Sequence, residues 1–163
     1  MSHALTTFFE PRQIAVIGAS AVEGKSGYVV VANILANGYE GKIYPVNPRG
    51  GQILGLPVTR SISELPQGID VAVIILPAEH TVQALRECAA KGIRHAVLLA
   101  GGFAEVDEGR AKLQEELVDV LKKTGIRTLG PNTSGHTSTP FKFTSSLFPL
   151  GKIRPGRVSF IAQ

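Results

Sequence analysis

The sequence contains no tryptophan and a single cysteine, Cys88, among 163 residues. One cysteine cannot close an intramolecular disulfide, so the chain is not a small secreted domain held by disulfides, and we expect it in a reducing cytoplasm. Cys88 lies within the helical pattern of residues 82–90. That setting favours a packed, inert thiol over a nucleophile or a metal ligand.

Long apolar runs and clusters of one charge are also missing. No stretch is long enough to cross a bilayer, and Met1 to Ala4 show no basic segment followed by an apolar one, so we expect neither membrane attachment nor a signal peptide. The net charge of +4 is spread out, without the Lys and Arg cluster that marks nucleic-acid binding. No His, Cys or carboxylate group has metal-ligand spacing, so we predict no metal site.

What the sequence does contain is an alternation of short apolar runs and amphipathic stretches. Strands are expected over 14–18, 42–46, 71–76, 96–99 and 127–129, and helices over about 27–37, 77–91 and 108–123. This order predicts an α/β fold, a Rossmann-like, doubly wound, mostly parallel sheet with helices on both faces. If residues 56–59 form the third strand, the strand order would be 3-2-1-4-5-6.

The glycine-rich loop after the first apolar run is the main candidate for ligand binding. Residues 14–17 end in Gly18-Ala19-Ser20, and Lys25 and Gly27 precede the next helix. Small residues let backbone amides approach an anion, and the helix adds its positive N-terminal end. The stretch therefore predicts a phosphate site.

Three phosphate ligands compete for this loop. A P-loop NTPase would need glycine at position 19, which is Ala19, and an acid after a later strand. An NAD enzyme would need an acid at the end of the second strand, where the sequence reads Asn47-Pro48-Arg49. Arg49 could instead pair with a phosphate on the ribose, which leaves NADP and coenzyme A.

The other strand ends supply loops of matching character. Parallel strands present their carboxyl ends at one edge of the sheet, so the loops after residues 17, 46, 76, 99 and 129 should share one crevice. These loops read Gly-Ala-Ser, Asn-Pro-Arg, Pro-Ala-Glu, Ala-Gly-Gly-Phe and Gly-Pro-Asn. All are small, polar or proline-bearing, as a long, narrow ligand would require.

These five loops, taken in order, resemble the CoA-binding domain of NDP-forming acyl-CoA synthetases, the superfamily of ADP-forming acetyl-CoA synthetase and the succinyl-CoA synthetase alpha subunit. The motifs that carry the resemblance are residues 18–27, 43–49, 70–78, 100–105 and 130–132. The resemblance covers nearly the whole chain. It implies coenzyme A as the ligand.

The resemblance also implies roles for individual residues. The loop from Ser20 to Lys25 would hold the phosphates, Arg49 would lie near the nucleotide phosphate, and Asn132 would lie near the thiol. Residues 77–78 would line the adenine or pantetheine side, and residues 99–101 would flank the pantetheine arm. The implied site comprises Gly18, Ala19, Ser20, Lys25, Gly27, Asn47, Arg49, Pro77, Ala78, Leu99, Ala100, Gly101 and Asn132. Thr133 stands where many relatives have cysteine.

In the family that it resembles, acid, CoA and ATP are converted to acyl-CoA, ADP and phosphate through an acyl phosphate and a phosphorylated histidine. That histidine belongs to a later, ligase-like domain, and the nucleotide belongs to an ATP-grasp domain. We therefore expect residues 1–132 to be a CoA-binding domain without catalytic residues. Residues 133–163 would be an extension, with residues 157–163 as the first strand of the next domain. The alternatives are an NADP-binding oxidoreductase domain and the CoA-binding domain of a protein acetyltransferase fusion.

The histidines and one acidic cluster receive weaker assignments. His80 and His95, at a helix start and a strand start, favour surface or capping roles. His136 lies in a Gly/Ser/Thr-rich loop that we expect near the crevice, so it is a minor candidate for a ligand contact. Glu105, Asp107 and Glu108 are interpreted as a helix-start cluster.

Overall fold

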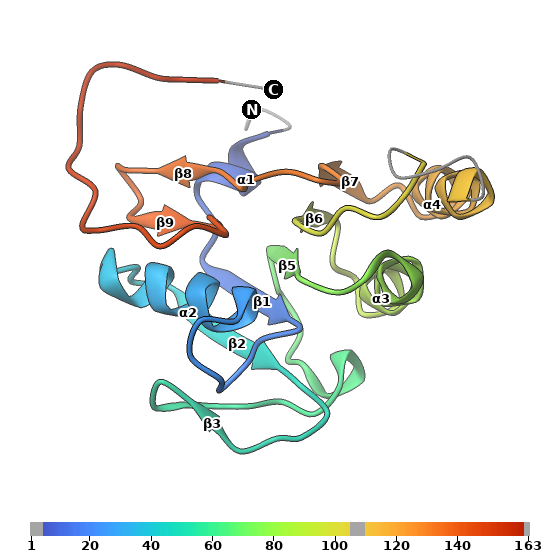
Figure 1. Cartoon of the computed structure of the whole chain (residues 1–163), viewed down its shortest axis with the longest axis horizontal. Helices are drawn as coiled ribbons and strands as arrows, with labels where there is room; N and C mark the ends of the chain where they lie inside the picture. The colour runs from blue at the N-terminus through green and yellow to red at the C-terminus, as the bar shows by residue number, and fades with distance from the viewer. Residues whose placement is uncertain (1–4, 105–109, 162–163) are drawn as a thin grey trace.

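The core of the molecule is one five-stranded, fully parallel sheet (Figure 1). The structure is a computed structural model and describes residues 5–104 and 110–161. The strands lie in the order β2-β1-β5-β6-β7, and each pairs in parallel with its neighbour. Their bounds are β1 Gln13–Ile17, β2 Lys42–Val46, β5 Val71–Ile74, β6 His95–Leu98 and β7 Arg127–Leu129. The predicted α/β, Rossmann-like fold is confirmed.

The two central strands are apolar at almost every position because both faces of the sheet are covered. Ile14 and Val16 of β1 pack into one core cluster, whereas Ala15 and Ile17 pack into the other. The period of two along a strand divides each run between two cores. A continuous apolar run therefore indicated the correct burial for β1 and β5.

Two helices and one helical turn cover the first face. These are α3, Ala78–Ala90, α4, Ala111–Thr124, and the 3-10 turn η1, Ile62–Glu64. Leu85 of α3 and Leu117 of α4 are buried in the same cluster. Gly125 ends α4 in the left-handed conformation, as expected for a helix stop. The predicted acidic cluster Glu105, Asp107 and Glu108 lies outside the described residues. Among the described helices, none has the length and apolarity needed to cross a membrane.

One long helix and a small hairpin cover the second face (Figure 1). The helix is α2, Ser26–Ala36, and the hairpin joins β8, Thr137–Ser138, to β9, Phe143–Thr144. The short helix α1, Thr6–Phe9, contributes the buried ring of Phe8. Phe143 of β9 is fully buried in the cluster that also contains Phe8. Within the predicted extension of residues 133–163, the sequence gave no sign of this hairpin, because two-residue strands are too short to show a period.

The predicted third strand does not join the main sheet. Residues Leu56–Pro57 form β4, which pairs antiparallel with β3, Gln52–Ile53, in a separate two-stranded sheet. Only Thr59 reaches β2, at one isolated bridge to Val46. Pro57 has no backbone N–H, so it cannot donate to a sheet neighbour. In chain order the main sheet therefore reads 2-1-3-4-5, not 3-2-1-4-5-6.

The predicted strand over residues 157–163 is not formed in its described part, residues 157–161. Val158, Phe160 and Ile161 are 91%, 87% and 97% exposed. A strand needs a neighbour that satisfies its backbone groups, and the described chain places none beside this segment. The predicted division of the chain at residue 132 stays a prediction.

Residues 146–153, which precede residues 157–161, are held along α2 by side-chain amides. Asn33 is 4% exposed and donates through Nδ2 to the carbonyls of Ser146 (3.0 Å) and Phe148 (2.8 Å). Its Oδ1 accepts from the Leu150 amide at 2.9 Å, and Asn37 Oδ1 accepts from the Ile153 amide at 2.9 Å. Two asparagines one helical turn apart thus replace a strand partner for this segment.

His136 belongs to the core of the second face, which corrects its predicted place near the crevice. Its Nε2 lies 2.7 Å from the Phe8 carbonyl, and its Nδ1 lies 2.9 Å from the Ser145 hydroxyl. Phe8 in turn packs edge-on against His95, the first residue of β6, at 5.0 Å between ring centroids. His136 is therefore near the amino ends of the strands. Burial lowers the pKa of its imidazole.

This burial predicts a stability that is lost as the pH is lowered. Because the folded pKa of His136 is lower than the unfolded value, the unfolded chain binds the proton first, so stability is present above about pH 6.5 and is lost below it. His95, whose pKa is lowered first by partial burial and then by Arg127, acts in the same direction. The free energy of unfolding from urea titrations should fall between pH 7.5 and 5.5, with a contribution from His136 of up to about 1.4 kcal/mol per pH unit. His136→Asn should show a shallower slope than the original chain. An unchanged slope in His136→Asn would contradict the assignment.

Candidate functional site

The carboxyl ends of the five strands meet at one edge of the sheet, where two adjoining hollows lie. The first is a cleft of about 450 Å³ between the ends of β1 and β2 and the start of α3. The second, of about 380 Å³, lies beneath the glycine loop at the start of α2. Gly18 lines both, so the hollows adjoin at that residue. This is the edge where open α/β sheets bind ligands.

Close backbone contacts give the glycine loop its shape. Gly18 has φ +88°, and a Cβ there would overlap the carbonyl oxygen of Ile75. A Cβ at Gly27 would overlap the carbonyl oxygen of Gly18 itself. Glycine at these two positions lets α2 lie directly against the end of β1. Gly18 and Gly27 thus act first as packing residues that form the floor of the hollow.

Donors surround the hollow at the start of α2. Lys25 precedes the helix, and its carbonyl accepts from the amides of Tyr28 and Val29. Within the described chain, the amides of Ser26 and Gly27 have no intramolecular acceptor, as is usual for the first turn of a helix. Ser20 Oγ accepts from the Val22 amide at 3.0 Å, which leaves its hydroxyl proton available. The structure therefore brings the predicted Ser20, Lys25 and Gly27 together around one anion-sized space.

Asn47 joins this loop to the loop after β2. Its Nδ2 donates to the Ala19 carbonyl at 2.7 Å, and its Oδ1 accepts from the Arg49 amide at 2.9 Å. The side chain of Asn47 is therefore committed to holding two loops together. Arg49 is exposed and is not among the residues that line the cleft.

Sequence reasoning missed several residues that do line the cleft, among them Arg60, His80 and Gln83. Arg60 follows the isolated bridge between Thr59 and Val46, which carries it to the carboxyl edge of the sheet. The sequence did hold a possible signal for Arg60, because it is the first residue after the predicted third strand. His80 and Gln83 are on the exposed face of α3; the sequence favoured a surface or capping role for His80 and gave no sign of Gln83.

The other predicted residues surround the ends of β5, β6 and β7. Pro77 precedes α3, and Ala78 is buried beneath Gly102. Leu99 is 2% exposed, so its side chain packs in the core and only its backbone borders the loop. The Ala100 carbonyl accepts from the Asn132 amide at 3.3 Å, which ties the loops after β6 and β7 together. Asn132 is exposed.

Arg110 fixes the Ala100–Gly102 loop to the start of α3, a link that the sequence did not reveal. Its Nη1 donates to the Gly102 carbonyl at 2.7 Å and lies 2.8 Å from Glu79 Oε1. The backbone amide of Glu79 lowers the pKa of its carboxyl, and Arg110 adds to this effect. The loop that borders the predicted pantetheine path is therefore held at a set position on α3.

Reactive groups are scarce at this edge. Cys88 is buried, and burial raises the pKa of its thiol to about 12, which confirms the predicted inert thiol. Within residues 5–104 and 110–161, no group of three or more His, Cys, Asp or Glu side chains is placed to hold a metal ion.

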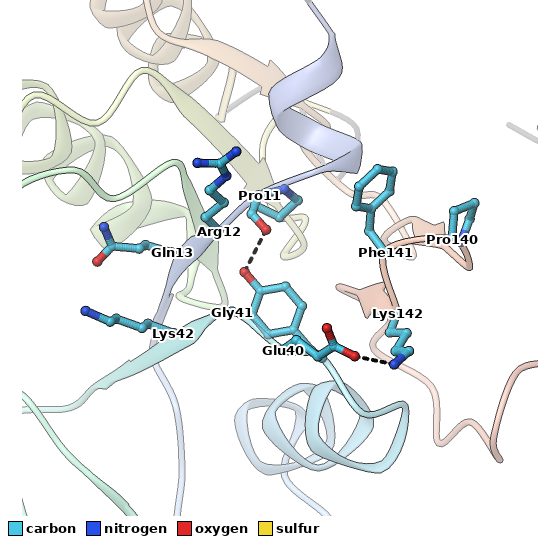
Figure 2. A pocket seen from close by; sticks show the side chains of 10 residues that line it. Pro11, Arg12, Gln13, Glu40, Gly41, Lys42, Pro140, Phe141 and Lys142 are labelled. Atoms are coloured by element: carbon cyan, nitrogen blue, oxygen red, sulfur yellow. Dashed lines mark hydrogen bonds and ion pairs between the residues drawn. The ribbon is translucent and has the colours of Figure 1, made fainter.

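A larger cavity of about 670 Å³ lies at the opposite, amino edge of the sheet (Figure 2). There the Tyr39 hydroxyl donates to the Pro11 carbonyl at 3.0 Å, and Lys142 pairs with Glu40. These contacts anchor the hairpin loop and the start of β1. The backbone amides of Arg12 and Gln13, which line this cavity, donate to Asp70 Oδ2 at 2.7 and 2.9 Å, so these two donors are not available to a ligand.

Comparisons with known proteins agree on one family. The family described as CoA binding domain matches residues 12–138. The alpha subunit of ADP-forming acetate–CoA ligase I from Pyrococcus furiosus is 41% identical across 98% of this chain, which covers 35% of that subunit. ADP-forming acetate–CoA ligase II from Archaeoglobus fulgidus is 42% identical across 98% of this chain, which covers 24% of that protein. The chain thus spans about a third of one relative's length and a quarter of the other's.

Solved structures agree with this similarity. The dinucleotide-forming acetyl-coenzyme A synthetase 1 of Ca. Korarchaeum cryptofilum, in complex with phosphate and ADP, superposes with a TM-score of 0.83 at 36% identity. The superposition covers 89% of this chain and 31% of the synthetase. PH0766 from Pyrococcus horikoshii has the same TM-score at 35% identity, over 91% of this chain and 34% of its own.

The contact at Gly27 predicts the cost of adding one methyl group. Alanine usually favours a helix over glycine, but at Gly27 its Cβ would overlap the Gly18 carbonyl, so α2 would have to move. Gly27→Ala should lower the free energy of unfolding by about 1–3 kcal/mol, measured by chemical denaturation. Gly151→Ala is the matched control, because a Cβ there meets nothing within 4 Å. Equal stability of both variants would show that the close contact at Gly27 is not a constraint.

Proposed function

The chain belongs to the CoA binding domain family, and on this premise we propose that it binds coenzyme A or acyl-CoA at the carboxyl edge of its sheet. The observation that carries the proposal is the hollow at the start of α2, where helix amides, a serine hydroxyl and a lysine surround one space. Such a hollow matches the pyrophosphate that joins the two halves of coenzyme A.

The phosphate site follows from charge and hydrogen bonding. The amides of Ser26 and Gly27 would donate to the pyrophosphate, and the α2 dipole would favour its negative charge. Lys25 is exposed at the rim and is in none of the ion pairs of the described residues, so its ammonium can reach a phosphate oxygen. Ser20 would add a hydroxyl donor.

The two hollows give the ligand a direction. From the phosphate site, the cleft beside β2 extends over the apolar side chains of Ile17, Val46 and Ile62, which suit an adenine ring. The opposite direction crosses the loops after β5, β6 and β7, where Ala100 and Gly101 present little side chain. The pantetheine arm would follow this second path, with Asn132 near its thiol end.

The role of the whole protein is a further part of the proposal. The relatives named above are ADP-forming acetate–CoA ligases, and this chain covers only part of each. We propose that the chain supplies coenzyme A to ligase-like and ATP-grasp domains or subunits that perform the chemistry. Residues 133–163 would lead into the ligase-like part, and the chain alone would bind without catalysing. The cytoplasmic location stays a prediction.

Calorimetric titration tests the proposal through Lys25. Lys25→Ala removes a charge-assisted contact to the pyrophosphate and should weaken coenzyme A binding by about 1–3 kcal/mol, roughly 5- to 150-fold. Lys112→Ala is the matched control, because it removes the same charge from an exposed position of α4. Its affinity should equal that of the original chain.

Two outcomes would contradict the proposal at different levels. Tight binding of NADP without binding of coenzyme A would overturn the ligand and point to a dinucleotide oxidoreductase domain. Coenzyme A binding that Lys25→Ala leaves unchanged would keep the ligand but remove Lys25 from the phosphate site.

A further inference from the structure

Arg60 is the arginine that lines the cleft beside β2. It shares the lining with Gly18 and Asn47, the residues that connect the cleft to the glycine loop. Both arginines are exposed, but Arg49, which the sequence favours for a ribose phosphate, is not part of this lining. The two arginines therefore differ in what they can reach, although both follow the end of β2.

Gly50 makes room for the Arg60 side chain. The Nε, Cζ and Nη2 atoms of Arg60 lie 3.0, 3.4 and 3.4 Å from the position that a Cβ of residue 50 would occupy. Gly50 also has φ +65°, which a side chain rarely adopts. The guanidinium thus rests against the bare backbone of the Asn47–Gly51 loop. Its location is set by the fold of that loop.

The charge of Arg60 is not neutralised by a neighbouring carboxylate. Its backbone amide donates to Glu64 Oε2 at 3.3 Å, but its guanidinium is in none of the ion pairs of the described residues. Glu87 lines the same cleft, and its carboxylate accepts from Gln83 Nε2 at 3.1 Å. An available guanidinium at the wall of an apolar cleft favours a ligand that combines a ring with an anion.

We propose that Arg60 determines specificity for a phosphate on the adenosine ribose, and so distinguishes coenzyme A from dephospho-CoA. This inference rests on the proposed function, because the pyrophosphate in the adjoining hollow is what directs the adenosine into this cleft. With the adenine over Ile17 and Ile62, the ribose lies at the mouth, between the glycine loop and Arg60. Its phosphate then meets a planar donor group that can bind it through two N–H bonds.

The test compares two ligands that differ by one phosphate. Dissociation constants for coenzyme A and dephospho-CoA are measured by calorimetry on the whole 163-residue chain and on Arg60→Gln. The original chain should bind coenzyme A more tightly. Arg60→Gln should weaken coenzyme A binding by roughly 10- to 100-fold, the usual range for one charge-assisted contact, and should leave dephospho-CoA unchanged. The retained dephospho-CoA affinity also shows that the variant is folded.

Two further variants complete the test. Arg86→Gln removes the same charge from an exposed position of α3 outside the cleft lining, and it should keep the original ratio of the two affinities. Arg49→Gln is the competing variant. If the ratio collapses in Arg49→Gln and persists in Arg60→Gln, the inference is overturned.

The remaining outcomes separate this inference from the proposed function. If the original chain binds both ligands equally, Arg60 has no such role but the chain still binds coenzyme A. The same holds if Arg60→Gln weakens both ligands to the same extent. If the original chain binds neither ligand, the proposed function fails and this inference fails with it.

Discussion

The contact between Gly27 and the carbonyl of Gly18 sets the geometry of the whole carboxyl edge. It brings the first turn of α2 against the end of β1, so the free amides of the helix face the space where β1 ends. A side chain at either position would separate helix from strand and turn those amides away. Asn47 then holds the loop after β2 to Ala19, which gives the hollow a second wall. The proposed phosphate site is thus a consequence of how closely one helix can pack against one strand.

The sequence predicted the elements of the sheet well because their burial is simple. Strands such as Val71–Ile74, buried on both faces, are continuous apolar runs, and helices such as Ala78–Ala90 show a clear apolar stripe. It failed where structure depends on distant partners. The β8–β9 hairpin exists because Phe143 enters a core formed by the sheet and α1, and two-residue strands leave no local pattern. Conversely, residues 157–161 have a good strand pattern, but no strand is placed beside them in the described chain.

The candidate site also combines residues that the sequence revealed with residues that it did not. The glycine loop could be read directly, because the close approach that it makes is between residues only nine positions apart, Gly18 and Gly27. The role of Asn47 as a brace and the place of Arg60 in the cleft could not be read, because each depends on how one loop folds over another. Arg49 and Arg60 are equivalent in charge and near each other in sequence. Arg60 follows the bridge from Thr59 to Val46 and lies in the space that the missing side chain of Gly50 leaves open, and neither contact is visible in the sequence.

The two edges of the sheet are braced differently, and this difference favours the carboxyl edge as the proposed binding site. At the amino edge, side chains consume backbone groups of the chain: Asp70 accepts from the amides of Arg12 and Gln13, and Tyr39 and His136 bond to the carbonyls of Pro11 and Phe8. At the carboxyl edge the braces join loop to loop, through Asn47 and Arg110, and they leave the first amides of α2 without partners. In the described chain, these amino-edge backbone groups are therefore satisfied by side chains, whereas the amides of Ser26 and Gly27 at the carboxyl edge keep their donors. Because an unpaired donor gains most from an anion where water is partly excluded, the second edge is where binding energy is available.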